Sequence, residues 1–143
     1  MAQTFSTELT GIDSTPPVKP SATSAYGARV KRFRATITLA AQASGDTVVL
    51  ADLPAGFVPA FFLINTSVTL GTATLALGTA ASPALYNAAT AYTVVGTPTF
   101  AGNTAMAALP ATTATTRVLA TIGAAALPGS GSLVIDLYAS SPN

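Results

Sequence analysis

The residue types that usually carry enzyme chemistry are scarce in this sequence. It contains no histidine and no cysteine, and only five acidic residues among 143 positions. A Ser-His-Asp triad, a histidine metal site and thiolate chemistry are therefore excluded. A hydrolase with paired carboxylates needs two acids facing one cleft, whereas Asp46 and Asp52 stand at opposite ends of a short predicted strand and Asp136 lies on the polar face of another. For these acids we predict turn capping and one ion pair with Arg117, and for the chain no catalysis, cofactor or metal.

The sharpest charge feature is a basic cluster formed by Arg29, Lys31, Arg32 and Arg34. Nucleic-acid binding usually needs a larger basic surface with stacking aromatic residues. The sequence pI of about 8.1 is modest, so we do not expect nucleic acid as a partner. Two interpretations stay open: the cluster docks onto an acidic surface of another protein, or it is a solvated strand edge that its charges keep from pairing.

Residues 53–116 contain no charged side chain, although half of the sequence is hydrophobic. Charged residues normally cover the surface of a soluble monomer because they are rarely buried. A membrane-spanning helix needs about 20 apolar residues in a row, and here proline, glycine and threonine interrupt every apolar run. The first residues also lack the pattern of a secretory signal. We therefore expect a soluble, intracellularly made protein without a membrane partner, which buries this stretch in its core and against copies of itself.

Two parts of the chain differ in composition. Residues 1–27 include Pro16, Pro17 and Pro20 among small polar residues, which predicts an extended N-terminal arm. The arm could be a floppy tail or could gain structure against a neighbouring subunit. Residues 28–143 are predicted to form one β-sandwich domain.

The domain shows period-two alternation typical of half-buried strands. Between 32 and 39, Phe33, Ala35, Ile37 and Leu39 face one side, and arginine and threonine face the other. About seven or eight strands without a sustained helical period predict an all-β fold, an antiparallel β-sandwich or jelly roll. We predict a loop at 79–91, a helical turn near 105–109 stopped by Pro110, and strands at 32–39, 47–51, 57–65, 72–77, 92–95, 98–100, 117–122 and 132–138.

The predicted strand 57–65 is apolar on both faces, with Pro59 indicating an edge or a bulge. Homo-oligomer interfaces are more apolar than ordinary protein surface. We therefore predict that Phe57, Phe61, Phe62 and Ile64 contribute to a self-interface.

Several segments resemble small virion proteins of tailed bacteriophages. They are residues 45–50 (GDTVVL), 53–59 (LPAGFVP), 67–78 (SVTLGTATLALG) and 133–140 (LVIDLYAS). The resemblance implies a β-rich decoration or cement protein on the capsid surface, often a homotrimer at capsid symmetry axes. Its partners would be the major capsid protein and copies of itself, and it would be made in the host cytoplasm. The resemblance supplies no functional residues, because such proteins act through shape and contact area.

Two other functions stay open. One is a receptor- or glycan-binding sandwich of a head or tail fibre, for which Tyr86, Tyr92 and Tyr138 are the candidate exposed aromatic residues. The other is a head-tail or tail component of the virion.

Overall fold

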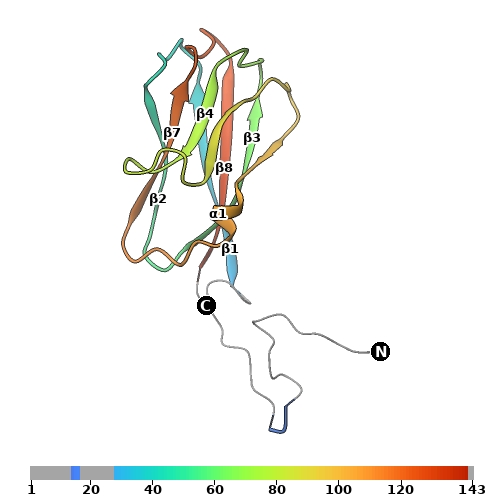
Figure 1. Cartoon of the computed structure of the whole chain (residues 1–143). Coiled ribbons are helices and arrows are strands. Elements are labelled where there is room, and N and C mark those ends of the chain that lie inside the picture. The colour runs from blue at the N-terminus through green and yellow to red at the C-terminus, as the bar shows by residue number, and fades with distance from the viewer. Residues whose placement is uncertain (1–13, 17–27, 142–143) are drawn as a thin grey trace.

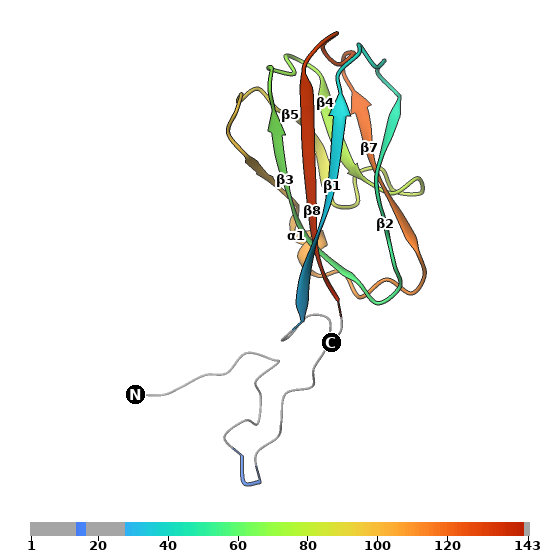
Figure 2. The same cartoon turned by 180° about the vertical axis from the view of Figure 1, so that it is seen from behind.

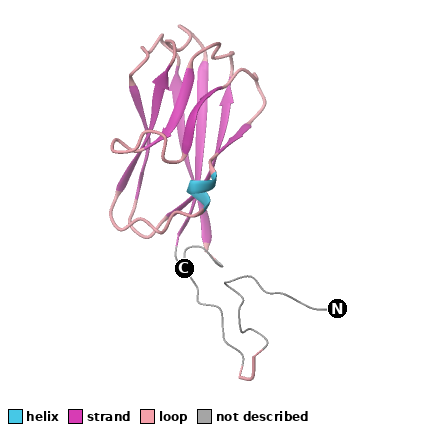
Figure 3. Cartoon of the chain, viewed as in Figure 1, coloured by secondary structure: helices cyan, strands magenta, loops and turns pink. Residues whose placement is uncertain are grey.

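The computed structural model describes residues 14–16 and 28–141. In this part, eight strands form two four-stranded antiparallel sheets that pack face to face, with one short helix (Figures 1 and 3). This confirms the predicted all-β sandwich. Most of the predicted arm 1–27 lies outside the described residues. The first sheet has the order β1 (Arg29–Thr38), β8 (Ser132–Ser141), β3 (Val58–Thr66), β6 (Thr99–Ala101), and the second β2 (Thr47–Leu53), β7 (Thr116–Gly123), β4 (Thr74–Gly78), β5 (Asn87–Ala91).

The order of the strands is that of a jelly roll. Strand β1 pairs with β8, β2 with β7, β3 with β6 and β4 with β5, so the pairs are nested from the chain ends inward. The β3–β8 and β4–β7 pairs then join these four pairs of strands into two sheets. Such a double-sheet arrangement of eight strands defines the jelly-roll class.

Alternation along the strands decides which side chains form the core. In β1, Ile37 is buried while Arg34 and Thr36 are exposed, and in β8 Leu133 and Ile135 point inward. These inward residues pack against the second sheet, where Leu75 and Val118 are fully or almost fully buried. Burial of the apolar sides of both sheets is the main stabilising contribution to a sandwich of this kind.

Strand β3 is central in its sheet, and Pro59 coincides with an irregularity in it. The register between β3 and β8 shifts between Pro59 and Phe61. Proline has no N–H to donate to a ladder and is tolerated in sheets at edges or bulges. The predicted edge-or-bulge alternative is therefore resolved as a bulge.

Two predictions between residues 79 and 95 were wrong. The predicted loop 79–91 contains β5, which pairs with β4, while the predicted strand 92–95 makes only a single bridge, from Val95 to Thr66. The sequence of β5, Asn-Ala-Ala-Thr-Ala, has low β propensity and most of it is exposed. Its pairing is imposed by the neighbouring β4, which local propensity does not reveal.

The predicted helical turn is present as α1 (Thr104–Ala107). The side chain of Asn103 caps it by accepting a hydrogen bond of 2.8 Å from the backbone N–H of Met106, whose side chain is buried. Within the described ranges, no helix is long and apolar enough to cross a membrane.

Candidate interaction surface

Within residues 28–141, no segment covers the outer face of the first sheet. Figure 2 shows β1, β8 and β3 facing the viewer with no other described segment crossing them. By contrast, Gly78 on the outer side of β4 lies directly beneath the backbone of Ser82 and Pro83, which belong to the following loop. We call the uncovered side the open face. Its outward side chains come from four strands: Arg32 and Arg34 (β1), Val134, Asp136 and Tyr138 (β8), Phe61, Leu63 and Asn65 (β3), and Phe100 (β6).

Three aromatic rings form a stack across the open face. The ring of Phe61 lies 4.7 Å from that of Tyr138 and 4.9 Å from that of Phe100, with interplanar angles of 16° and 18°. These separations match the distance of about 4.8 Å between neighbouring strands, so the rings stand on the sheet and cover one another's faces. Phe100 ends the stack on edge strand β6 and is 65% exposed. It is the most exposed of the large apolar residues in the described part of the chain.

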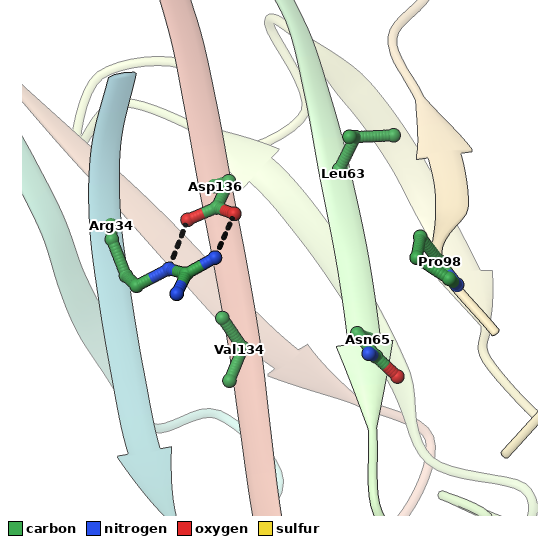
Figure 4. Close-up of a pocket in the computed structure, with 6 residues that line it drawn as sticks. All are labelled: Arg34, Leu63, Asn65, Pro98, Val134 and Asp136. Atoms are coloured by element: carbon green, nitrogen blue, oxygen red, sulfur yellow. Dashed lines mark hydrogen bonds and ion pairs between the residues drawn. The ribbon is translucent and has the colours of Figure 1, made fainter. Parts of the chain in front are cut away.

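An ion pair lies beside the stack. The Arg34 guanidinium donates two hydrogen bonds to Asp136, from Nε to Oδ1 at 2.8 Å and from Nη2 to Oδ2 at 2.7 Å (Figure 4). The hydrogen bonds from Arg34 hold the pKa of Asp136 below its ordinary value, although partial burial of the carboxylate opposes this shift. The face therefore contains a carboxylate whose charge is already matched within the same chain.

The ion pair predicted for Arg117 is present. Arg117 pairs with Asp52 across β2 and β7, with hydrogen bonds of 2.8 and 2.9 Å. Asp136 pairs with Arg34 instead, because register places these two residues opposite each other on β1 and β8. Asp46 caps a turn, as predicted, by accepting a hydrogen bond from the N–H of Ala43 at 2.9 Å.

A hollow of about 210 Å³ opens on the same face next to Phe100. Figure 4 shows that its walls come from three adjacent strands and from the residue just before β6. Leu63, which lines the hollow, is also the register partner of Phe100. The lining residues are Arg34, Leu63, Asn65, Pro98, Val134 and Asp136.

The predicted basic cluster is divided between two places. Arg34 belongs to the ion pair, whereas Arg29, Lys31 and Arg32 are exposed at the start of β1, at the foot of the sandwich (Figures 1 and 2). The ammonium of Lys31 lies 5.2 Å from the centre of the Phe57 ring, within range of a cation–π interaction. We call the group Arg29, Lys31 and Arg32 the basic foot.

Most of the predicted apolar interface residues lie in the core. Phe62 and Ile64 are 0% and 1% exposed, and Phe57 is 7% exposed. Phe62 and Ile64 point between the sheets, because a strand turns alternate side chains to opposite faces, and Phe57 packs in the same core just before β3 begins. Of the four residues, only Phe61 lies on the open face, which leaves it as the one that a partner could contact here.

Sequence reasoning missed Phe100 and misplaced two tyrosines. Tyr86 and Tyr92 are 2% and 4% exposed, so they do not provide the exposed aromatic surface expected for a glycan-binding module. Burial raises the pKa of both phenols. The strand that carries Phe100 was predicted, but three residues are too few for alternation to indicate which side chain faces outward.

The open face combines apolar, aromatic and paired charged side chains. No group of three or more metal-capable side chains occurs in residues 14–16 and 28–141. What the face offers is an aromatic stack, a neutralised ion pair and a hollow beside a projecting ring.

Comparison with known proteins places the fold among phage capsid chains. Neither a protein-family model nor a curated protein matches the sequence. A chain in the structure of the cyanophage Pam1 capsid asymmetric unit is similar, with a TM-score of 0.60, 20% identity, and coverage of 82% of this chain and 88% of that one. A chain in the capsid of Ralstonia phage GP4 has a TM-score of 0.62 and 22% identity, covering 89% of this chain and 90% of that one. At these identities the likeness shows a shared fold.

Proposed function

We propose that this chain is a structural virion protein of a tailed phage that binds the outer surface of the capsid lattice and stabilises it as a homo-oligomeric decoration, or cement, protein. The observation that carries the proposal is the match of the fold over at least 82% of this chain and 88% of each capsid chain. The phage-like sequence segments support the same assignment.

The composition of the surface fits a role in assembly. A decoration protein acts through contact area and shape, and standard protein–protein interfaces bury about 1,600 Å² in total. The sandwich presents an open face with a projecting aromatic ring, and a basic foot at the start of β1 whose Arg32 borders that face, so both surfaces are available to partners. A receptor- or glycan-binding module is less well supported, since two of the three tyrosines expected to bind sugar are buried.

We assign contact with the major capsid protein to the basic foot. Within the described residues, Arg29, Lys31 and Arg32 form no ion pair with a carboxylate; the two pairs involve Arg34 and Arg117. Exposed unmatched cations favour an acidic partner surface and accelerate association through electrostatic steering. The edge strand β1 carries these charges, which also discourages pairing with strands of a like-charged copy.

Binding to purified shells that lack the protein tests this proposal. A triple variant, Arg29→Gln, Lys31→Gln and Arg32→Gln, should co-sediment with shells at least tenfold more weakly than the unmodified chain. Arg117→Gln is the matched control, because it removes one exposed cation from the other sheet and should bind normally.

Two results would count against the proposal. If the unmodified chain does not bind shells, or does not delay their rupture on heating, the decoration role is wrong. If the triple variant binds as well as the Arg117→Gln control, the decoration role stands but the basic foot is not the contact.

A further inference from the structure

Phe100 is an unusual residue to leave in solvent. Burying an aromatic side chain removes roughly 150–250 Å² of surface from water, so an exposed phenylalanine forgoes a large favourable contribution. The ring cannot turn into the neighbouring hollow without leaving its stack on Phe61, which holds it at 4.9 Å. It therefore projects from the edge of the sheet as a knob whose outer surface has no contact within the described chain.

The hollow beside it is large enough for an aromatic ring, and three of its six lining residues are apolar. Its volume is about 210 Å³, whereas benzene is accommodated by an apolar protein cavity of roughly 150 Å³. Leu63, Pro98 and Val134 provide apolar walls. The Arg34 side chain is 51% exposed and is held in place by Asp136, so a ring entering the hollow can also contact a fixed guanidinium plane.

The distribution of charge on the open face indicates which partner supplies the aromatic ring that enters the hollow. Strands β3 and β6 lie in the stretch 53–116, which contains no charged residue. The carboxylate of Asp136 is matched by Arg34, so around the hollow two copies of the open face can meet without uncompensated like charges, and Arg32, which has no ion pair within the described residues, lies toward the start of β1. An acidic or a basic partner would instead find almost nothing on this face to complement it, apart from Arg32 at its foot end.

We infer that the open face is the site of self-association, and that Phe100 of one copy inserts into the hollow of a second copy lined by Leu63, Pro98, Val134 and the Arg34–Asp136 pair. The knob and the hollow lie side by side on one face, as a self-complementary interface requires. Each copy then provides both halves of the contact. This inference rests on the homo-oligomeric part of the proposed function, and it identifies the partner of the open face as the chain itself.

Native mass spectrometry and sedimentation velocity, from 0.1 to about 100 μM protein, provide the test. Phe100→Ser removes the knob and should weaken self-association at least tenfold. Asn65→Trp places a large ring in the hollow and should weaken it similarly. Val49→Ser is the matched control, because Val49 is 52% exposed on the second sheet, and its loss should leave the oligomer unchanged. Circular dichroism establishes that each variant is folded.

Mixing the two variants makes the test specific. The Asn65→Trp chain keeps its knob and the Phe100→Ser chain keeps its hollow, so the mixture should form hetero-oligomers that neither variant forms alone at the same concentration. A purely non-specific loss of apolar surface would give no such recovery.

The inference is overturned if the unmodified chain is monomeric at 100 μM, if Phe100→Ser associates as well as the Val49→Ser control, or if the mixture shows no recovery. If Phe100→Ser keeps its oligomeric state but no longer binds shells, the open face serves the capsid and the inference is again wrong. Shell binding is measured separately with the basic-foot variants, so a failure of self-association does not imply failure of the decoration role.

Discussion

The packing of β4 against the loop that follows it can be tested with the substitution Gly78→Ala, which adds one carbon atom. Gly78 is buried at the end of β4, and a Cβ built on it would meet the carbonyl oxygen of Ser82, with the carbonyl carbon and oxygen of Pro83 both 2.5 Å away. These are backbone atoms. The Ser82 carbonyl also accepts hydrogen bonds from the N–H groups of Thr79 and Leu85, at 3.0 and 3.1 Å. The loop must therefore move as a unit if Gly78 becomes alanine.

The expected cost of Gly78→Ala follows from these contacts. Overpacking of this kind costs about 1–3 kcal/mol, and each weakened hydrogen bond adds about 0.5–1.5 kcal/mol. Alanine also lowers the conformational entropy of the unfolded chain, which offsets about 0.4–1 kcal/mol of this loss. With both hydrogen bonds weakened, we expect a net loss of about 1–6 kcal/mol in the free energy of unfolding, which at roughly 4 °C per kcal/mol lowers Tm by about 4–24 °C.

Gly129→Ala is the matched control. A Cβ at Gly129 has no heavy atom within 4 Å, and its φ lies outside the left-handed region. It should be neutral or stabilising by up to about 1 kcal/mol. Thermal and urea unfolding, followed by circular dichroism at one protein concentration, compares the two variants. If Gly78→Ala is as stable as Gly129→Ala, the loop does not rest on β4 as described, and the second sheet is not covered there.

Three further predictions concern the core, the ion pair and the helix cap. Phe62→Ala should lower the free energy of unfolding by about 3–5 kcal/mol in urea denaturation, because its side chain is fully buried between the sheets. The pKa of Asp136 is lowered in the folded state, so its contribution is present above the ordinary carboxyl pKa of about 3.9 and is lost as pH falls through the folded value. Thermal melts from pH 7 to 2.5 should therefore show a smaller fall in Tm for Asp136→Asn than for the unmodified chain, and equal slopes would contradict this. Asn103→Ala removes the cap of α1 and should cost about 0.5–2 kcal/mol, seen as faster hydrogen exchange at the N–H of Met106.

The parts of the fold that could be predicted are those in which one face is buried and the other is not. The first strand alternates Phe33, Ala35 and Ile37 with arginine and threonine, and burial follows this pattern. Alternation fails as a guide for the segment 57–65, where both faces are apolar. It identifies the strand but not the side on which Phe61 or Phe62 lies. The pairing of this strand with β8 determines which of its side chains face outward.

The candidate surface was harder to predict because its residues are distant in sequence. Arg34 and Asp136 are 102 positions apart and meet only through the register of β1 and β8. Phe100 lies on the same face because it belongs to β6, a strand of three residues that is too short to show a periodic pattern. Composition did indicate that a large uncharged stretch must be buried or covered, but the covered side could be chosen only once the sheets were known.

The two proposed contacts differ in physical origin, and this makes them separable by salt. Seven of the eleven charged residues lie in the first 34 positions, including the basic foot, whereas the knob and half of the residues that line the hollow come from the uncharged stretch 53–116, and the two charges in the hollow pair with each other. Screening shortens the reach of exposed charges from about 10 Å at 0.1 M salt to about 3 Å at 1 M, while apolar burial is not weakened by salt. Raising sodium chloride from 0.1 to 1 M should therefore release the chain from shells while its oligomeric state, followed by sedimentation velocity, stays unchanged. Release as monomers would show that self-association also depends on exposed charge, contrary to the contact inferred for Phe100.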